Sequence, residues 1–316
     1  MLTGALILSR TYALPDFFKK RFLRIICIHK KKRMIQNIEK VIRTRKSIRT
    51  YDGTAIEPET KQQIISYMQS CNEGIFGNRV DFYWIDGSAG EYKDVKLGTY
   101  GIINGTKSFI IGKVKEGERN MEDFGFCMEK VILYCTQLNI GTCWMGGTYK
   151  KTDFASAVGL QDDEIIPAIT PVGYFGTKRR TIDKMIRSIA GSEQRKAFDE
   201  MFFSESFSQP LAEKQRSAYG YFLEMVRLAP SASNKQPWRI VLMNNVFHFY
   251  LKRTPNYNNN KFLPSDLQRV DMGIAMSHFD LALSEKNVKH QWITVDPGLA
   301  TDEMTEYCFG CEVELP

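Results

Sequence analysis

Long hydrophobic runs are missing from this chain of 316 residues. No apolar stretch approaches the ~20 residues that a membrane-spanning helix needs, so an integral membrane protein is not expected. Histidine is scarce, with four residues, and none lies near Cys143 in the sequence. A cysteine nucleophile with a neighbouring histidine base is therefore not indicated.

A disulfide framework is also missing. The cysteines are odd in number and scattered, which favours a reducing compartment such as the cytoplasm. Only Cys308 and Cys311 form a close pair, with no second pair and no histidine nearby. Because a zinc site needs about four ligands, we expect no metal. We interpret the pair as two residues of a terminal strand, with a redox pair as the alternative. The seven cysteines are Cys27, Cys71, Cys127, Cys135, Cys143, Cys308 and Cys311.

A basic surface on the folded body is not expected either. The formal net charge is +7, but residues 1–33 hold nine basic residues against the single acidic Asp16. This extension therefore carries +8, and residues 34–316 carry −1. A nucleic-acid groove needs an excess of cations, so the body is not predicted to bind nucleic acid.

The extension itself, residues 1–33, leaves several interpretations open. It is basic and almost free of acidic residues, with some amphipathic character around residues 17–28. These features fit an organelle-targeting peptide or a helix on a membrane surface. We favour a segment without a structural role, because Met34 opens a regular helical pattern.

Periodicity predicts the elements of the chain up to residue 185. Helices are expected at 34–43, 58–71 and 121–138, and strands at 80–85 and 107–114. Two loops are expected at 44–56 and 141–147, followed by an apolar stretch at 165–175.

A second half, residues 186–316, repeats this outline without obvious sequence identity. Helices are expected at 211–228 and 267–283, and strands at 238–243, 246–251, 290–295 and 309–315. The first two strands are expected to form a hairpin around Asn244-Asn245, a pair that tolerates a tight turn. Long helices mixed with short antiparallel strands indicate an α+β fold, and the repeated outline indicates an internal duplication.

Three stretches carry residue types suited to one ligand. In the first, Arg45, Ser47 and Arg49 alternate, so an extended backbone turns all three to one side. Two guanidinium groups and a hydroxyl on one face suit a phosphate.

The second stretch is the loop 229–238. Pro230 and Pro237 stiffen its ends. Its short polar side chains offer hydrogen-bond donors and acceptors to the edge of a heteroaromatic ring. A turn held by Ser and Asn side chains explains some of these residues, but not all of them together.

The third stretch is Gly141-Thr142-Cys143-Trp144-Met145-Gly146-Gly147, directly after a predicted helix. Its glycines allow the backbone to approach a flat ligand closely. A backbone N–H group there would donate to a ring atom.

Together the three stretches resemble the nitroreductase family of FMN-dependent oxidoreductases. Arg-x-Ser-x-Arg at 45–49 resembles the family's phosphate motif, and Ala229–Trp238 is similar to its Ala-Pro-Ser-x-x-Asn-x-Gln-Pro-Trp loop. Residues 141–147 resemble its Gly-Thr-Cys-Trp-Gly loop. Gly173-Tyr174-Phe175-Gly176 with Lys178–Arg180 is similar to its closing segment, which also holds the phosphate.

The order of the motifs departs from the ordinary family. There the Pro-Ser loop follows the basic motif within ~30 residues, whereas here residues 71–80 keep only Asn78 of it. The well-matched loop lies in the second half. Ordinary members are homodimers, and this chain resembles the duplicated single-chain subfamily, a dimer fused into one polypeptide. The resemblance implies a nitroreductase-like pseudo-dimer, with mainly antiparallel central sheets flanked by helices and one competent site. The resemblance leaves two oligomeric states open, a monomer and a homo-oligomer.

The resemblance also implies the site residues and the activity. The activity would be hydride transfer from NAD(P)H through the N5 atom of FMN to a small organic acceptor, nitroaromatic or quinone-like, by a ping-pong scheme. The alternatives are a flavin-binding or flavin-storage protein without turnover and an enzyme with other flavin chemistry. Gly146 and Gly147 are expected to direct backbone amides at the flavin. The expected FMN-binding residues are Arg45, Lys46, Ser47, Arg49, Met145, Gly146, Gly147, Lys178, Arg180, Pro230, Ser231, Ala232, Ser233, Asn234 and Gln236.

Overall fold

The structure is a computed structural model that describes residues 35–87, 97–176, 194–257 and 265–314. Within it, the chain from Ile35 onward forms one compact unit. The predicted extension 1–33 lies outside the described residues, as do Lys178 and Arg180.

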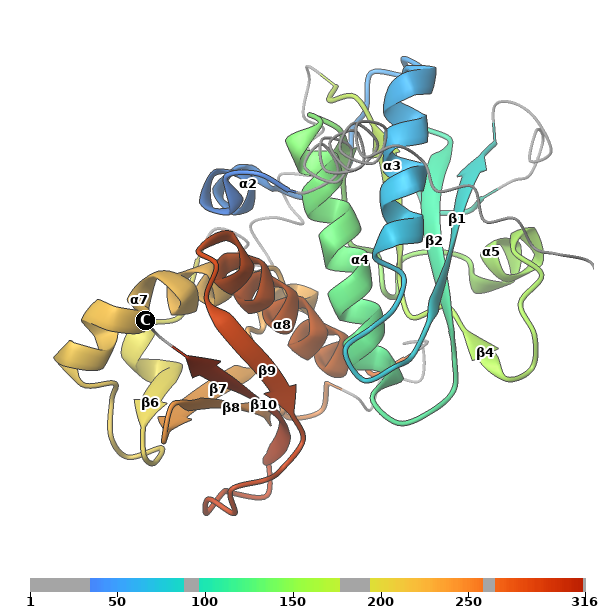
Figure 1. The fold of residues 1–316 in the computed structure, drawn as a ribbon. Coiled ribbons are helices and arrows are strands. Elements are labelled where there is room, and N and C mark those ends of the chain that lie inside the picture. Colours follow the sequence, from blue (N-terminus) through green and yellow to red (C-terminus); the bar gives the residue numbers. More distant parts are fainter. Residues whose placement is uncertain (1–34, 88–96, 177–193, 258–264, 315–316) are drawn as a thin grey trace, which may run out of the picture. The chain divides into compact units, whose positions relative to one another are not determined.

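Helices are interspersed with the strands of one sheet in the first half of this unit (Figure 1). Ile38, Val41 and Ile42 form the buried face of the first helix. The elements are α2 (Ile38–Thr44), α3 (Pro58–Ser70), β1 (Val80–Asp86), β2 (Ser108–Lys115), α4 (Asn120–Gln137), β3 (Gly141–Thr142), α5 (Lys151–Ala157), β4 (Glu164–Ile165) and β5 (Ile169–Gly173).

The second half has two long helices and a further sheet. Asn244 and Asn245 both have positive φ, 50° and 63°, in the tight turn between two of its strands. The elements are η2 (Phe198–Glu200), β6 (Phe202–Ser204), α7 (Glu213–Arg227), η3 (Ala232–Asn234), β7 (Trp238–Met243), β8 (Val246–Lys252), α8 (Leu267–Glu285), β9 (Lys289–Ile293) and β10 (Thr305–Glu314).

The two sheets share one strand order when their strands are matched along the chain. The first runs β1-β2-β5-β3, with β4 added beside β2, and the second runs β7-β8-β10-β9, with β6 added beside β7. All pairs are antiparallel except β6 with β7. The structure therefore confirms an α+β fold with mainly antiparallel sheets.

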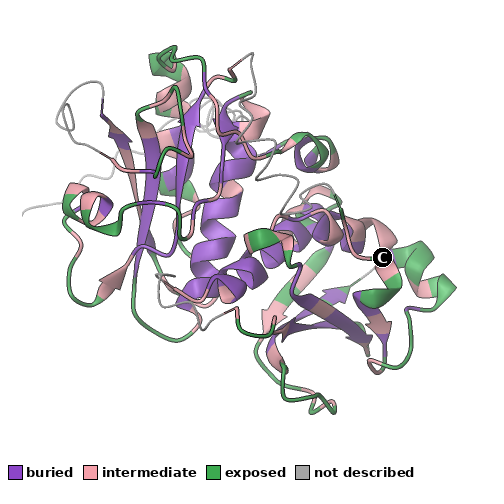
Figure 2. Ribbon diagram, turned by 180° about the vertical axis from the view of Figure 1, so that it is seen from behind, coloured by how far each residue is buried: buried purple, intermediate pink, exposed green. Residues whose placement is uncertain are grey.

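The core lies around α4 and α8, which pack against each other between the sheets. Figure 2 shows both helices buried over most of their length. They carry the same pattern, Asp-x-Gly-x-x-Met, at 123–128 and 271–276. The two glycines, Gly125 and Gly273, lie where the helices cross. A small residue at this point lets the two backbones meet.

The predicted element types are confirmed, with corrections at boundaries. The first helix begins at Ile38 rather than residue 34, because Asn37 caps it by accepting from the Lys40 amide at 3.3 Å. The last strand begins at Thr305, four residues earlier than expected. Helix α5 and strands β3, β4 and β6 were not predicted, and β3 lies within the predicted loop 141–147. Cys308 and Cys311 are free, buried residues of β10, as the terminal-strand interpretation required.

None of the helices in the described ranges has the length and hydrophobicity of a membrane span.

Candidate functional site

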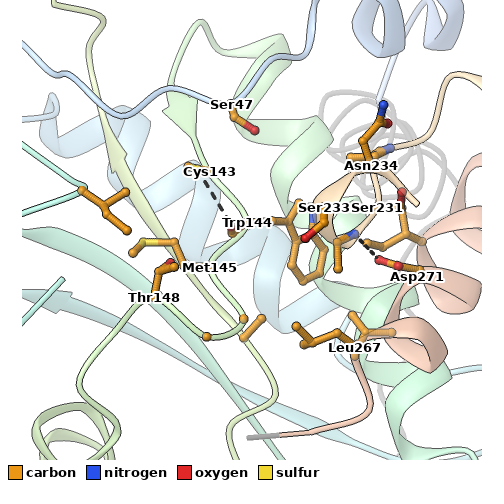
Figure 3. Close-up of a pocket in the computed structure, with 18 of the residues that line it drawn as sticks. Ser47, Cys143, Trp144, Met145, Thr148, Ser231, Ser233, Asn234, Leu267 and Asp271 are labelled. Carbon is orange, nitrogen blue, oxygen red and sulfur yellow. Dashed lines mark hydrogen bonds between the residues drawn. The ribbon is translucent and has the colours of Figure 1, made fainter. Parts of the chain in front are cut away.

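A cavity of about 480 Å³ is lined by residues from both halves. Its size is within the range of small-molecule and cofactor sites. Figure 3 shows Ser47, Cys143 and Met145 on one side, and Ser231, Ser233 and Asp271 on the other. Eleven of the predicted cofactor residues line it: Arg45, Ser47, Arg49, Met145, Gly146, Gly147, Pro230, Ser231, Ala232, Ser233 and Asn234.

The basic segment 45–49 is held in place by backbone pairing. The Ile48 amide donates to the Thr142 carbonyl at 2.8 Å, which joins the segment to β3. Gly141 permits this approach, because a Cβ there would lie 2.8 Å from the Phe175 ring and 3.1 Å from Ile48 Cβ. The extended backbone places Arg45, Ser47 and Arg49 on the cavity wall. Lys46 points away, with its ammonium group 5.9 Å from the centre of the Phe175 ring.

Arg195 is a cavity residue that the sequence did not reveal. Its guanidinium donates to the Asn234 side chain at 3.3 Å and to the Leu228 carbonyl at 3.2 Å. Burial and the nearby charges of Arg45 and Arg227 lower the pKa of Arg195. Positive charge therefore accumulates at this end of the cavity, which favours an anionic group there.

The loop 229–238 is held by its own side chains. Ser231 Oγ accepts from the Gln236 amide at 2.8 Å, and the Gln236 side chain accepts from the Lys196 amide at 2.9 Å. Ser233 and Asn234 have positive φ, 49° and 53°, so the loop is a tightly constrained turn. Gln236 is buried within the loop and does not line the cavity, in contrast to the neighbouring Ser231.

Asp271 and Asp123 occupy the same place in the two Asp-x-Gly-x-x-Met patterns. Asp123 accepts from the amides of Phe76 and Asn78, both at 3.0 Å, in the segment 71–80. Asp271 accepts from the Ala232 amide at 2.8 Å, in the loop 229–238 (Figure 3). Burial raises the pKa of both carboxyl groups, that of Asp271 strongly.

The loop 141–147 forms the wall opposite. Met145 pairs with Ile169 through both its amide and its carbonyl, at 3.0 Å each. Beyond this pair, the amides of Gly146 and Gly147 have no hydrogen-bond acceptor among the described residues. Gly146 lies against Leu267, where a Cβ would come within 2.6 Å of that side chain. These two amides are therefore available to a ligand.

Apolar side chains complete the cavity wall. Trp144, Leu267 and Ile274 line it together with Tyr257, whose hydroxyl lies 3.3 Å from Ser233 Oγ. In the described part of the chain, no group of three or more His, Cys, Asp or Glu side chains is arranged to hold a metal ion. The cavity thus combines a cationic end with a largely apolar body.

The fold is that of an α+β protein of the nitroreductase type. The chain matches the family described as “Putative TM nitroreductase” over residues 37–283. It belongs to this family, which confirms the resemblance inferred from the three motifs.

A solved structure shares the fold over most of this chain. A “putative nitroreductase” from Thermotoga maritima is 22% identical with a TM-score of 0.55, covering 88% of this chain and 94% of its own. A nitroreductase family protein from Clostridium novyi is 20% identical with a TM-score of 0.37, covering 45% and 87%. An “FMN-dependent nitroreductase” from Clostridium difficile is 12% identical with a TM-score of 0.33, covering 44% and 88%. No curated protein matches the chain.

Proposed function

We propose that this protein is an FMN-dependent oxidoreductase that transfers a hydride from NAD(P)H to a small organic acceptor, nitroaromatic or quinone-like. One observation carries the proposal. A single cavity joins three guanidinium groups and a serine hydroxyl at one end to a largely apolar wall. A ligand with a phosphate and a flat ring system matches this division.

The cationic end would bind the phosphate of FMN. Arg45, Ser47 and Arg49 come from one extended segment, and Arg195 comes from the start of the second half. Planar guanidinium groups suit phosphate oxygens, since each donates two parallel hydrogen bonds. A bound dianion would also offset the mutual repulsion of Arg45 and Arg195. Lys178 and Arg180 stay part of the proposed site, on the basis of the family resemblance alone.

The apolar wall would hold the isoalloxazine ring. The amides of Gly146 and Gly147 would donate to the N5–O4 edge, and the loop 229–238 would contact the ring or the ribityl chain from the other half. When bound, FMN supplies the hydride chemistry, taking the hydride from NAD(P)H and giving it to the acceptor. The described residues need only bind, orient and shield the FMN.

We propose one such site per chain, formed by halves that arose by duplication. The shared strand order of the two sheets and the paired Asp123 and Asp271 support this view. The start of α4 is the counterpart of the start of α8, which lines the cavity. At the start of α4, Glu122 is paired with Arg269 of α8, which also pairs with Glu306, at 2.7 Å each. The charge of Arg269 is already balanced by carboxylates, which disfavours a second phosphate site there.

Flavin binding tests the proposal directly. The dissociation constants of FMN and riboflavin, which lacks the phosphate, are measured by quenching of flavin fluorescence. Tighter binding of FMN, with a preference that falls as salt is raised, supports the cationic end as the phosphate site. Equal affinities would contradict that assignment, and no binding of either flavin would contradict the proposed function.

A further inference from the structure

A buried hydrogen-bonded network lies behind the cavity wall. Trp144, which lines the cavity, donates from its indole nitrogen to Glu129 Oε2 at 2.7 Å. Glu129 Oε1 lies 3.0 Å from His278 Nε2, and His278 Nδ1 lies 2.8 Å from the Met225 carbonyl. Glu129 belongs to α4, whereas His278 belongs to α8, so the network joins the two halves.

Hydrogen-bond geometry restricts where the protons of this network lie. A carbonyl oxygen only accepts, so His278 must donate from Nδ1 to Met225. One further proton then lies between His278 Nε2 and Glu129, and either location satisfies both groups. The side chains of Glu129 and His278 are both 0% exposed. In such an environment, loss of any one partner leaves a buried polar group without a hydrogen bond, which is costly.

We infer that Glu129 is a positioning residue of the cavity, which fixes the Trp144 ring and through it the loop that carries the Gly146 and Gly147 amides. Trp144 directly precedes Met145, whose backbone amide and carbonyl are both hydrogen-bonded to the backbone of Ile169. The loop is thus held by a strand pairing at Met145 and a side-chain anchor at Trp144. His278 supports the anchor from the second half.

The expected effect of Glu129 on flavin binding rests on the proposed function. If the cavity holds FMN, the anchor sets where the two glycine amides meet the flavin ring. Loosening the anchor would then weaken flavin binding without touching any residue at the cationic end. The hydrogen bond from Trp144 to Glu129 can be measured with or without a flavin, so the two claims fail separately.

The variants separate hydrogen bonding from charge. Trp144→Phe removes the indole donor together with part of the ring, whereas Glu129→Leu removes the acceptor and leaves the Trp144 ring intact. Glu129→Gln keeps the network satisfied, because its carbonyl oxygen accepts from Trp144 and its amide donates to a neutral His278 Nε2. Asp280→Leu is the matched control. It removes a partly buried carboxylate of α8 that pairs with Lys130 of α4 at 3.0 Å, in a network that does not line the cavity.

Two measurements decide the inference. The first is hydrogen exchange of the Trp144 indole N–H by NMR, assigned by its loss in Trp144→Phe. We expect faster exchange in Glu129→Leu, and exchange as in the wild type in Glu129→Gln and Asp280→Leu. The second is the FMN dissociation constant. We expect it to rise roughly five- to tenfold in Trp144→Phe and in Glu129→Leu, the fold-change of about one ordinary hydrogen bond.

Each outcome has a defined meaning. Wild-type FMN affinity in Trp144→Phe, or an equal loss of affinity in Asp280→Leu, would overturn the positioning role. If Glu129→Leu does not fold, Trp144→Phe and Glu129→Gln decide the result without it. If the wild-type protein binds no flavin, the proposed function fails, and the exchange rate alone decides whether Glu129 anchors Trp144.

Discussion

Gly125 of α4 and Gly273 of α8 meet at the crossing of the two central helices. A Cβ on Gly125 would lie 2.1 Å from the Val270 carbonyl oxygen and 3.1 Å from the Gly273 Cα. A Cβ on Gly273 would lie 1.9 Å from the Glu122 carbonyl oxygen. The helix backbones are therefore in direct contact here.

Gly125→Ala is expected to destabilise the protein by several kcal/mol, because only movement of a helix backbone can make room for the methyl group. Gly220→Ala in α7 is the control. There a Cβ would come no closer than 3.7 Å to the flexible Arg216 side chain, so the substitution should be neutral or stabilise by about 0.5–1 kcal/mol. Urea denaturation measures both free energies of unfolding. Equal effects of the two substitutions would show that the crossing is not tight.

The cationic end predicts the effect of removing each guanidinium. Arg45→Ala, Arg49→Ala and Arg195→Ala should each weaken FMN binding by about 1.5–3 kcal/mol, the range for a hydrogen bond to a charged group. Riboflavin binding should change much less. Arg79→Ala is the control, since that side chain is 72% exposed and pairs with Asp81 outside the cavity. Unchanged FMN affinity in all three cavity variants would remove the phosphate site from this account.

The contribution of the second half is tested at Asn234. Its side chain donates to the Gln194 carbonyl at 3.0 Å and accepts from Arg195, so it also orients that guanidinium. Asn234→Ala should weaken FMN binding by about 1 kcal/mol or more, through loss of hydrogen bonds and of the Arg195 position. Isothermal titration measures the change. If Asn234→Ala binds FMN as tightly as the wild type, the second half does not contribute as proposed.

Asp280 gives the protein a predictable response to acid. Burial alone would raise its pKa, but Lys130 and His290 outweigh burial and lower it to about 2. An unfolded aspartate titrates near 3.9. The ionised side chain therefore stabilises the fold above about pH 4, and this contribution is lost as the pH falls through about 2.

Asp280→Asn should accordingly lower the free energy of unfolding by on the order of 2 kcal/mol at pH 5, with a difference from the wild type that shrinks toward pH 2. His290, whose pKa is raised chiefly by its hydrogen bond to Asp280, still carries its charge at pH 5. Denaturation at several pH values gives the comparison. A difference that does not depend on pH would show that Asp280 acts without its charge.

Local chemistry made much of the fold predictable. Pro58 marks the first turn of α3, and the Asn244-Asn245 pair marks its hairpin turn, because each residue type has a backbone preference of its own. Helix α5 was missed because its seven residues bury only Phe154 and show no clear periodicity. Strand β6 was missed because its three residues are too few to show a pattern and pair with β7 and with Pro210.

The residues of the candidate site were likewise predicted only in part from the sequence. The alternation of Arg45, Ser47 and Arg49 placed all three on one wall, as an extended backbone requires. Arg195 gave no signal, since it is a single arginine in a polar segment and reaches the cavity only through the fold. Glu129 and His278 are 149 residues apart, so their pairing leaves no local pattern. Lys46 and Gln236 were assigned by motif position, whereas the structure turns one toward Phe175 and buries the other.

The central claim is that bound FMN exchanges a hydride with NAD(P)H in this cavity. The most direct measurement is an anaerobic titration of the FMN-loaded protein with NADH and with NADPH, followed by flavin absorbance. We predict that at least one nucleotide bleaches the flavin band stoichiometrically, and that a quinone or nitroaromatic acceptor restores it. A protein that binds FMN tightly but is bleached by neither nucleotide would contradict the account and identify a flavin-binding protein without this turnover.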